Sequence, residues 1–323
     1  MKILLCKNVQ LGSVCTENLD TKLSHKWKAA RIEKLSELID KAAQNNASYV
    51  FLCGRIFGQE RVSEMVIDHL FHAVKENLHI QVMAFLIVEE YNRISYRNDI
   101  PENLHLICVQ TTDTYNDNCI AVRIDHGNAE ILLSDNNPIW IKYTKEHGYI
   151  LTDNEDERRI PSFEPIGFED AEDSKVGYGL LEWSEDNNKS YTEFHYQKYA
   201  YASEVLKILP EDGQKDIIRK INNIVTNYDP DTFLRITIVG KSAFGLTLNS
   251  DALKNQLQNK IFFVEVYDNT IMDIDEEVFE NDISLRSEFV RLALQDDSLS
   301  ELERNRLISC GWNALNGKEV SAE

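Results

Sequence analysis

The residues of this chain that could do chemistry follow three short apolar segments, each typical of a buried strand. The first, KILLC, is followed by a polar turn with the amides Asn8 and Gln10; the second, YVFLC, by Gly and Arg55; and the third, VMAFLI, by Val88 and Glu89. Catalytic groups commonly lie at the carboxyl ends of such strands. Amides are weak metal ligands, however, and a guanidinium cannot ligate a metal. The pattern therefore suggests a site with the position of a catalytic centre but without its chemistry.

Three other patterns carry weaker signals. Gly-Lys-Ser at 240–242 looks like the end of a phosphate-binding loop, but such a loop needs a second glycine five residues earlier, where this chain has Arg235. His69 and His72 share one predicted helix face, where an isolated pair is more typical of a surface than of a metal site. The acidic run DNEDE at 153–157 is typical of a solvated loop.

Composition sets the class of protein. The chain has 323 residues, and single cores stop growing at roughly 250–300 residues, so one large and one smaller domain are expected. No apolar run approaches the ~20 residues that span a bilayer, and the N-terminus lacks signal-peptide features, so we expect a soluble, cytoplasmic protein with no membrane association. The six cysteines show no metal or disulfide spacing. A net charge of −20 means that any DNA contact would need a partner or a local basic patch.

The apolar pattern of the first half alternates between strand and helix periods. Leu35, Leu38 and Ile39 lie on one face of a predicted helix that begins near His25. Strands and helices in alternation predict an α/β layered fold, with Leu4, Val50 and Leu132 on neighbouring strands. The predicted elements are a strand over Met1–Cys6, a helix over His25–Asn45, a strand over Tyr49–Cys53, a helix over Ser63–Asn77, and strands over Val82–Val88, His105–Gln110, Ala121–Ile124 and Ile131–Leu133.

The second half is richer in strands and closes with two helices. A smaller α+β unit is expected after about residue 200. Ser298 and Glu301 read as a capping box that opens the last helix. The predicted elements are strands over Tyr178–Trp183, Thr192–Tyr196, Leu234–Gly240 and Ile261–Tyr267, and helices over Glu211–Thr226, Leu285–Gln295 and Leu299–Asn316.

These segments resemble the calcineurin-like metallophosphoesterases, in particular the SbcD and YhaO type of DNA repair exonuclease subunit. The family's block S-D-L-H-L-G reads KNVQLG at 7–12, its block G-D-I-F reads GRIF at 54–57, and its block G-N-H-D falls on IVEE at 87–90. Its later histidine falls on Asp135, and its final G-H-x-H block falls on DNED at 153–156. FEPIGF at 163–168 resembles the family segment P-E-P-L-G-F, and LRSEFVR at 285–291 resembles its C-terminal helix, so the resemblance spans nearly the whole chain.

The resemblance implies that a metal site has been lost. Such enzymes hold two metal ions, usually manganese, about 3.5–4 Å apart, and these ions activate the attacking hydroxide and absorb the developing charge. None of the family's ligands is retained at the matching positions of this chain. The degenerate metal-site positions are Asn8, Gln10, Arg55, Val88, Glu89, Asp135, Asn154 and Asp156.

The fold implied by the resemblance is a layered αββα metallophosphoesterase sandwich over residues 1–200 with a smaller α+β capping domain over residues 201–323. The implied function is that of a pseudoenzyme: a DNA repair exonuclease homologue that holds no metal, has no functional catalytic residue and acts by binding. The family's partner is an SMC-like ATPase with long coiled coils, on which the two C-terminal helices could dock. A homodimer is a further expectation from the resemblance.

Two alternatives stay open. The first is a residual metal-dependent exonuclease or phosphodiesterase that holds Mn or Mg at a rebuilt site made of Glu89, Asp135, Asp153 and Asp156, since carboxylates alone can hold magnesium. The second is a module that binds a small ligand or phosphate in the old cleft. Arg55 would oppose a cation, and we expect it to point into the cleft and pair with at least one of these four carboxylates.

Overall fold

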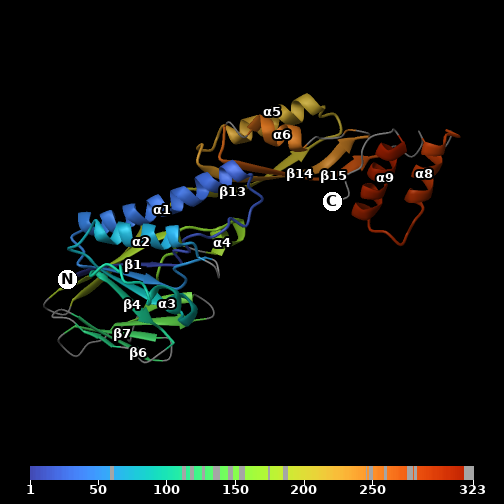
Figure 1. Ribbon diagram of the computed structural model, residues 1–323. Coiled ribbons are helices and arrows are strands. Elements are labelled where there is room, and N and C mark those ends of the chain that lie inside the picture. Colours follow the sequence, from blue (N-terminus) through green and yellow to red (C-terminus); the bar gives the residue numbers. More distant parts are fainter. Residues whose placement is uncertain are drawn as a thin grey trace. The chain divides into compact units, whose positions relative to one another are not determined.

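The chain divides after Tyr199 into two compact units, Met1–Tyr199 and Ala200–Glu323, and each is described by itself. Figure 1 shows the computed structural model, with the expected division at residue 200 falling in the yellow-green part of the chain. The structure describes residues 1–315 except 59–61, 111–113, 117–119, 126–127, 134–138, 145–147, 153–156, 174, 185–187, 245, 247–249, 258–259, 275–278 and 280–281.

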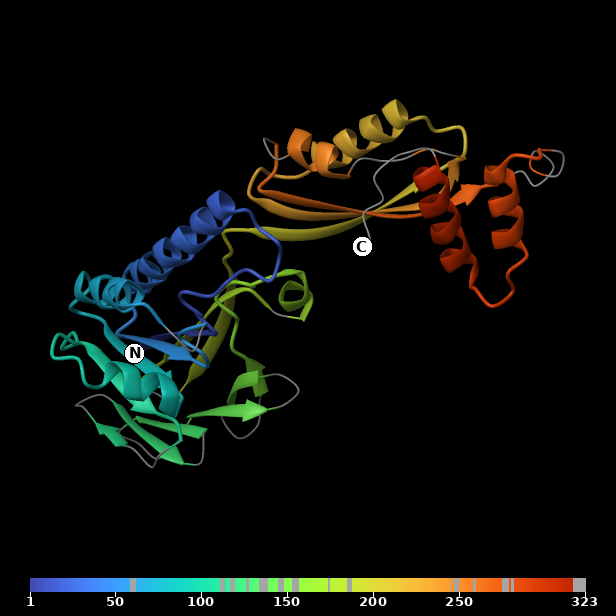
Figure 2. The same cartoon turned by 45° about the vertical axis from the view of Figure 1, so that its right-hand side comes forward.

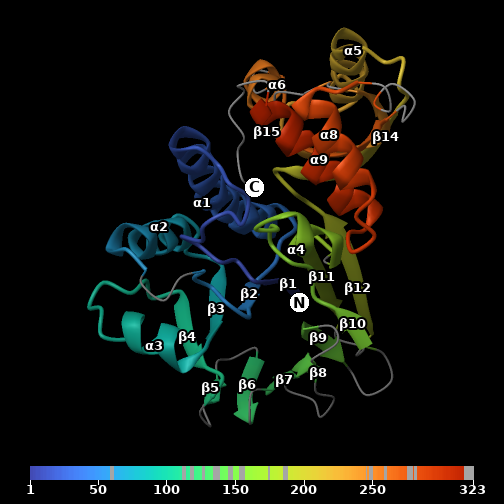
Figure 3. The ribbon, with the colours of Figure 1, turned by 90° about the vertical axis from the view of Figure 1, so that its right-hand side faces the viewer.

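The first unit is built on a sheet with the strand order β12-β11-β1-β2-β3-β4. The four strands β1 to β4 are parallel, so their carboxyl ends lie at one edge, whereas β11 pairs antiparallel with both β1 and β12. Figure 3 shows this series of strands side by side. The strands are β1 (Lys2–Lys7), β2 (Tyr49–Cys53), β3 (Gln81–Leu86), β4 (Leu104–Cys108), β11 (Gly177–Trp183) and β12 (Lys189–His195).

Helices α1 (Thr21–Gln44) and α2 (Glu64–Lys75) cover one face of this sheet (Figure 1). Helix α1 begins after Asp20, whose carboxylate accepts a hydrogen bond from the N–H of Leu23 at 2.8 Å and satisfies one of the free amides of the first turn. Leu38 of α1, Leu70 of α2 and alternate strand residues such as Leu52 form one continuous apolar core. Two short helices complete the unit, α3 (Val88–Ile94) and α4 (Phe168–Asp173).

The opposite face of the first sheet packs on a second sheet with the order β10-β9-β8-β7-β6-β5, in which all neighbouring strands are antiparallel. Phe51 and Phe85 of the first sheet meet Val122 and Ile131 of the second in a separate core. The unit therefore has a helix layer, a sheet and a second sheet in that order. The strands are β5 (Thr114–Asn116), β6 (Ile120–Asp125), β7 (Asn128–Leu133), β8 (Ile139–Thr144), β9 (Gly148–Thr152) and β10 (Glu157–Arg159).

The expected mixed α/β architecture is confirmed, but two predictions for this unit are wrong. Leu4 does pair with Val50, whereas Leu132 pairs with Ala121 in the second sheet. Short connections favour antiparallel hairpins, because a parallel partner needs a long crossover, and this keeps β7 beside β6 and β8. The third strand ends at Leu86, and Val88 begins helix α3 instead of ending that strand.

The second unit contains a parallel sheet of β13 (Ala200–Ile208), β14 (Thr232–Ala243) and β15 (Phe263–Asp273). Helices α5 (Gln214–Val225) and α6 (Ser250–Leu257) lie together on one face of it (Figure 2). Ile217 and Ile221 of α5 pack on Ile236 of β14 in the core of this unit. The Gly-Lys-Ser tripeptide at 240–242 lies inside β14, not in a loop before a helix, so the phosphate-loop reading is excluded.

Two helices close the second unit, α8 (Leu285–Leu294) and α9 (Glu301–Leu315), which pack on each other around Val290 and Ile308. Ser284 caps α8 by accepting from the N–H of Ser287 at 3.3 Å. The capping box of α9 is shifted by two residues from the predicted one. Glu303 accepts hydrogen bonds from the N–H and hydroxyl of Ser300, at 2.8 and 2.6 Å, because the chain turns helical only at Glu301.

Candidate functional site

The loops after β1 and β2 lie side by side at the carboxyl edge of the first sheet. The N–H of Asn8 donates to the carbonyl of Cys53 at 2.9 Å, and the N–H of Gln10 donates to the carbonyl of Arg55 at 3.1 Å. Leu11 continues the pairing with a 2.8 Å bond to the carbonyl of Ile56. The backbone thus brings together the first two predicted blocks of the degenerate site.

The first of these loops has an unusual backbone. Asn8 has φ 55° and Gln10 has φ 49°, in the left-handed region that disfavours side chains other than glycine. Asn tolerates this region, but Gln does so less readily, so Gln10 costs conformational energy that the surrounding contacts must offset. Backbone strain often concentrates at functional sites, so the conformation of Gln10 marks this edge of the sheet as the candidate site.

The third block joins the same edge through Glu90, which sequence reasoning missed. Glu90 lies in the first turn of α3, is 4% exposed, and its Oε1 accepts from the N–H of Phe57 at 2.9 Å. Among the residues that the structure describes, its Oε2 has no hydrogen-bond partner. Burial raises the pKa of Glu90, and nearby amides and the charge of Arg55 oppose that shift. The sequence did carry a signal, because Glu90 and the buried Ile94 are four residues apart on one helix face.

Of the remaining predicted site residues, the structure describes Val88, Glu89 and Arg55. Val88 donates its N–H to the side chain of Gln110 at 2.7 Å, and Glu89 is exposed. Arg55 is also exposed, and no ion pair joins it to Glu89 in the described part of the chain. The other three carboxylates expected to pair with Arg55 lie outside the described residues, as does one further predicted position; these four are Asp135, Asp153, Asp156 and Asn154.

A buried ion pair ties the segment around Glu164 to helix α1. The Lys34 ammonium and the Glu164 carboxylate form an ion pair whose side chains are 2% and 1% exposed. Lys34 also donates to the carbonyl of Phe163 at 2.6 Å, and Glu164 accepts from the N–H of Tyr199 at 3.0 Å. Burial lowers the pKa of Lys34, whereas the charge of Glu164 opposes that shift. Phe163 and Glu164 lie within FEPIGF at 163–168, one of the segments that carry the family resemblance.

Arg31, one helical turn before Lys34, reaches the loop directly. Its guanidinium donates to the carbonyl of Val9 at 2.8 Å and to the carbonyls of Glu164 and Pro165 at 3.1 Å each. Val9 lies between the two strained residues of the site. The sequence carried a signal for these buried contacts. Arg31 and Lys34 lie on the same face of α1 as the apolar Leu35 and Leu38, and charged residues on an apolar face indicate buried partners.

Two basic side chains, Lys7 and Arg159, lie near each other at the end of β1. Burial lowers the pKa of Lys7, and the nearby charge of Arg159 lowers it further. The positive charge of Arg159 opposes the binding of a divalent cation beside it. Within the ranges that the structure describes, no group of three or more His, Cys, Asp and Glu side chains is positioned to hold a metal.

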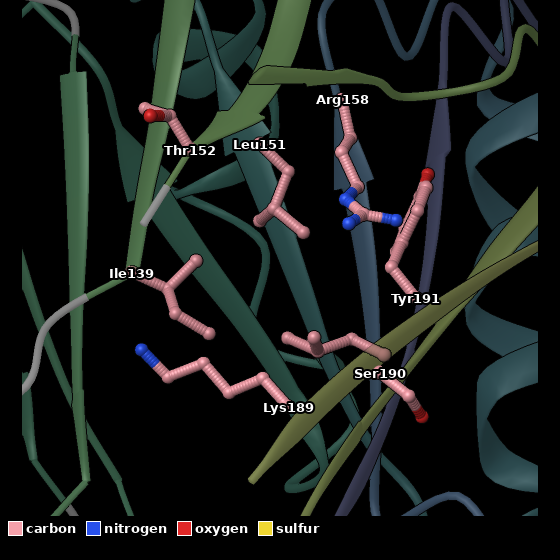
Figure 4. Close-up of a pocket in the computed structure, with 8 residues that line it drawn as sticks. Ile139, Leu151, Thr152, Arg158, Lys189, Ser190 and Tyr191 are labelled. Carbon is pink, nitrogen blue, oxygen red and sulfur yellow. The ribbon is translucent and has the colours of Figure 1, made fainter. Parts of the chain in front are cut away.

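A small cavity lies where the ends of the two sheets meet (Figure 4). Its volume is about 30 Å³, which is room for about one water molecule. Leu151 and Ile139 form its apolar side, and Figure 4 shows the side chain of Arg158 beside that of Tyr191. A cavity of this size cannot take a nucleotide, so it is not a candidate nucleotide site.

Neither a protein-family model nor a curated protein matches this sequence. In the parts of the chain that the structure describes, no helix combines the length and apolar character needed to cross a membrane.

The raised pKa of Glu90 leads to a pH-dependent prediction. A carboxyl whose pKa is raised by folding holds its proton more tightly in the folded state, so stability falls as pH rises from the ordinary glutamate pKa of 4.5 toward the folded-state value. Glu90→Gln removes this titration but keeps an oxygen that can accept from Phe57. We expect it to remove part of the stability loss that the wild type shows as the pH rises above 4.5.

Chemical denaturation of Glu90→Gln across that pH range makes the measurement. The matched control is Glu89→Gln, a change at the exposed neighbouring residue that should leave the pH profile of the wild type intact. Parallel profiles for the wild type and Glu90→Gln would contradict the assignment of a titrating buried carboxyl.

Proposed function

We propose that this chain is a catalytically inactive relative of the SbcD and YhaO type of metallophosphoesterase, and that it works as a binding subunit. The helix layer and the two packed sheets match three of the four layers of the αββα sandwich of that family, which supports the proposal. The resemblance of the blocks at 7–12, 54–57 and 163–168 supports the same proposal, since the first two meet at one sheet edge. In that arrangement the unit after Tyr199 is the capping domain.

The chemistry of the edge supports inactivity. Two-metal hydrolysis needs several anionic or imidazole ligands converging on the same point. Here the matching backbone positions carry Asn8, Gln10 and Arg55, and the buried carboxyl nearby, Glu90, bonds to a backbone amide. A guanidinium and neutral amides offer a metal no charge compensation.

The observation that carries a binding role is an apolar stripe on helix α8. Ile283, just before the helix, is 97% exposed, and Leu285 and Leu292 are 74% and 60% exposed. Leu285 and Leu292 are one heptad apart and so lie on the same face, whereas Val290 and Ala293 pack toward α9. Single exposed apolar residues are normal, but a stripe on one helix face is typical of an interaction surface.

The partner that suits this stripe is the coiled coil of an SMC-like ATPase. A coiled coil offers an apolar seam flanked by charged side chains, which can accept a second helix along its length. The acidic chain, with its net charge of −20, favours a basic partner and makes DNA contact dependent on that partner. A homodimer remains part of the proposal through the family resemblance.

The catalytic half of the proposal predicts that the purified protein binds manganese only substoichiometrically and shows no manganese-dependent exonuclease activity above the buffer blank. Elemental analysis and a DNA digestion assay, run beside a family member with intact ligands, make the measurement. Stoichiometric manganese, or digestion that is lost in Asp156→Asn, would instead support a rebuilt site that includes the carboxylates at 135, 153 and 156.

The binding half is tested separately with a purified antiparallel coiled-coil segment of an SMC-like ATPase from the same organism. We expect the double variant Leu285→Asp, Leu292→Asp to weaken binding at least about tenfold, since each buried leucine contributes roughly 1.5–3 kcal/mol. Leu78→Asp, at an exposed leucine of the other unit, is the matched control. Equal binding by all three proteins would rule out the stripe as the docking surface.

A further inference from the structure

An apolar groove lies between helices α1 and α2, on the face of the first unit that points away from the second sheet. Its volume is about 880 Å³, within the ~300–1,000 Å³ typical of sites for drug-sized ligands. The middle of the groove is lined by Ala29 and Ile32 of α1 and by Met65 and Val66 of α2. It is a much larger space than the 30 Å³ cavity between the sheets.

Each helix contributes one face to the groove. Residues 25, 28, 29, 32 and 33 of α1 and residues 65, 66 and 69 of α2 line it, and both sets follow the spacing of a single helix face. Met65 is among the most exposed large apolar side chains of the unit. The groove is therefore a continuous apolar surface held on two rigid elements.

Polar side chains line both ends of the groove, but the two ends carry different charged groups. Both helices connect parallel strands, so both begin at the carboxyl edge of the sheet. His25 and Lys28 consequently lie toward that edge, where Leu11 and Gly12 also line the groove. Glu33 lies eight residues after His25, about 12 Å along the helix axis, and His69, the sixth residue of α2, is the last residue of that helix to line the groove.

We propose that this groove binds a linear aliphatic monocarboxylate, with its carboxylate beside Lys28 and His25 and its chain along Ile32 and Val66. A lysine ammonium forms a charge-assisted hydrogen bond with a carboxylate, and the apolar middle takes the alkyl chain out of water. Glu33 disfavours a second carboxylate at the far end. The occupant is thus a single-headed amphiphile, and the site is independent of the proposed binding to a coiled coil.

Isothermal titration of the full chain with sodium decanoate tests the proposal. Decanoate is expected to bind at one site, and both sodium acetate and decyltrimethylammonium at least about tenfold more weakly, because one lacks the chain and the other has the wrong charge. Lys28→Met should weaken decanoate binding about tenfold, whereas Lys22→Met, at an exposed lysine of the same helix, should not.

A second pair of variants tests the part of the groove that holds the alkyl chain of decanoate. Met65→Asp should weaken decanoate binding about tenfold, and Leu78→Asp, at an exposed leucine outside the groove, should leave it unchanged. Thermal unfolding confirms that each variant is folded. The proposal is overturned if decanoate does not bind, if it binds Lys28→Met and Lys22→Met equally, or if decyltrimethylammonium binds as tightly as decanoate. It is also overturned if sedimentation shows a dimer that Met65→Asp dissociates, because a second copy of the chain would then be the occupant.

Discussion

Lys34→Met is expected to lower the free energy of unfolding by about 3–5 kcal/mol, because it leaves the Glu164 carboxylate buried without its counter-ion. Both side chains are almost fully buried, and Lys34 also donates to two backbone carbonyls, those of Phe163 and Tyr196, at 2.6 and 2.8 Å. Urea denaturation followed by circular dichroism makes the measurement. The effect should be among the largest that a single substitution outside the apolar core produces in this chain.

The control for Lys34→Met is Lys2→Met, which breaks the ion pair between Lys2 and Glu182. Both of those side chains are substantially exposed, so the loss should be at most about 1 kcal/mol. The double variant Lys34→Met, Glu164→Gln should recover part of the stability, since it removes the uncompensated charge. A Lys34→Met protein as stable as Lys2→Met would contradict the buried ion pair.

The second large effect is expected from Arg31→Met, at about 2–4 kcal/mol, because three backbone carbonyls lose buried donors at once. The guanidinium also lies over the Trp27 ring, 4.9 Å from its centroid, so methionine replaces only part of its contacts. Because one of the three carbonyls is that of Val9, amide hydrogen exchange of Leu11 should accelerate more than that of Leu52, which lies within β2.

Arg31→Lys should restore only a minor part of the loss, since one ammonium cannot reproduce a guanidinium that spans three acceptors. Arg219→Met, at an exposed arginine paired with Asp216 on α5, is the control and should change stability by less than about 1 kcal/mol. Uniform acceleration of exchange throughout the first unit would mean that Arg31 stabilises the fold as a whole and does not specifically hold the loop after β1.

The hydrogen bonds of Arg31, Lys34 and Glu90 hold the loops at the carboxyl edge and the segment beside them through protein contacts. In a two-metal site, the cations neutralise and fix the side chains at the strand ends. In this chain, Arg31 donates to the carbonyl of Val9 in the loop after β1, Lys34 holds the segment of Phe163 and Glu164, and Glu90 ties the loop after β2 to α3. These side chains hold the described backbone of the candidate site in place.

The local apolar period of the sequence was sufficient to place most elements of the first unit. The predicted strand over 49–53 is observed as β2, the predicted helix over 25–45 as α1 (Thr21–Gln44), and the predicted helix over 63–77 as α2. Apolar residues recur every two positions on the buried face of a strand and about every 3.6 positions on the buried face of a helix. Both repeats can be seen in residues that are close in the sequence. The mixed α/β class followed from the same patterns.

What only the tertiary structure decided was the pairing between distant segments and the burial of charge. The sequence did not show that Leu132 joins a second sheet, because hairpin pairing and crossover pairing are compatible with the same apolar run. Nor did it show that Glu90, and not its neighbour Glu89, is buried, or that Lys34 meets Glu164 across 130 residues. Those contacts depend on how complete layers pack, since removal of a charge from water is favourable only when partners from remote parts of the chain converge on it.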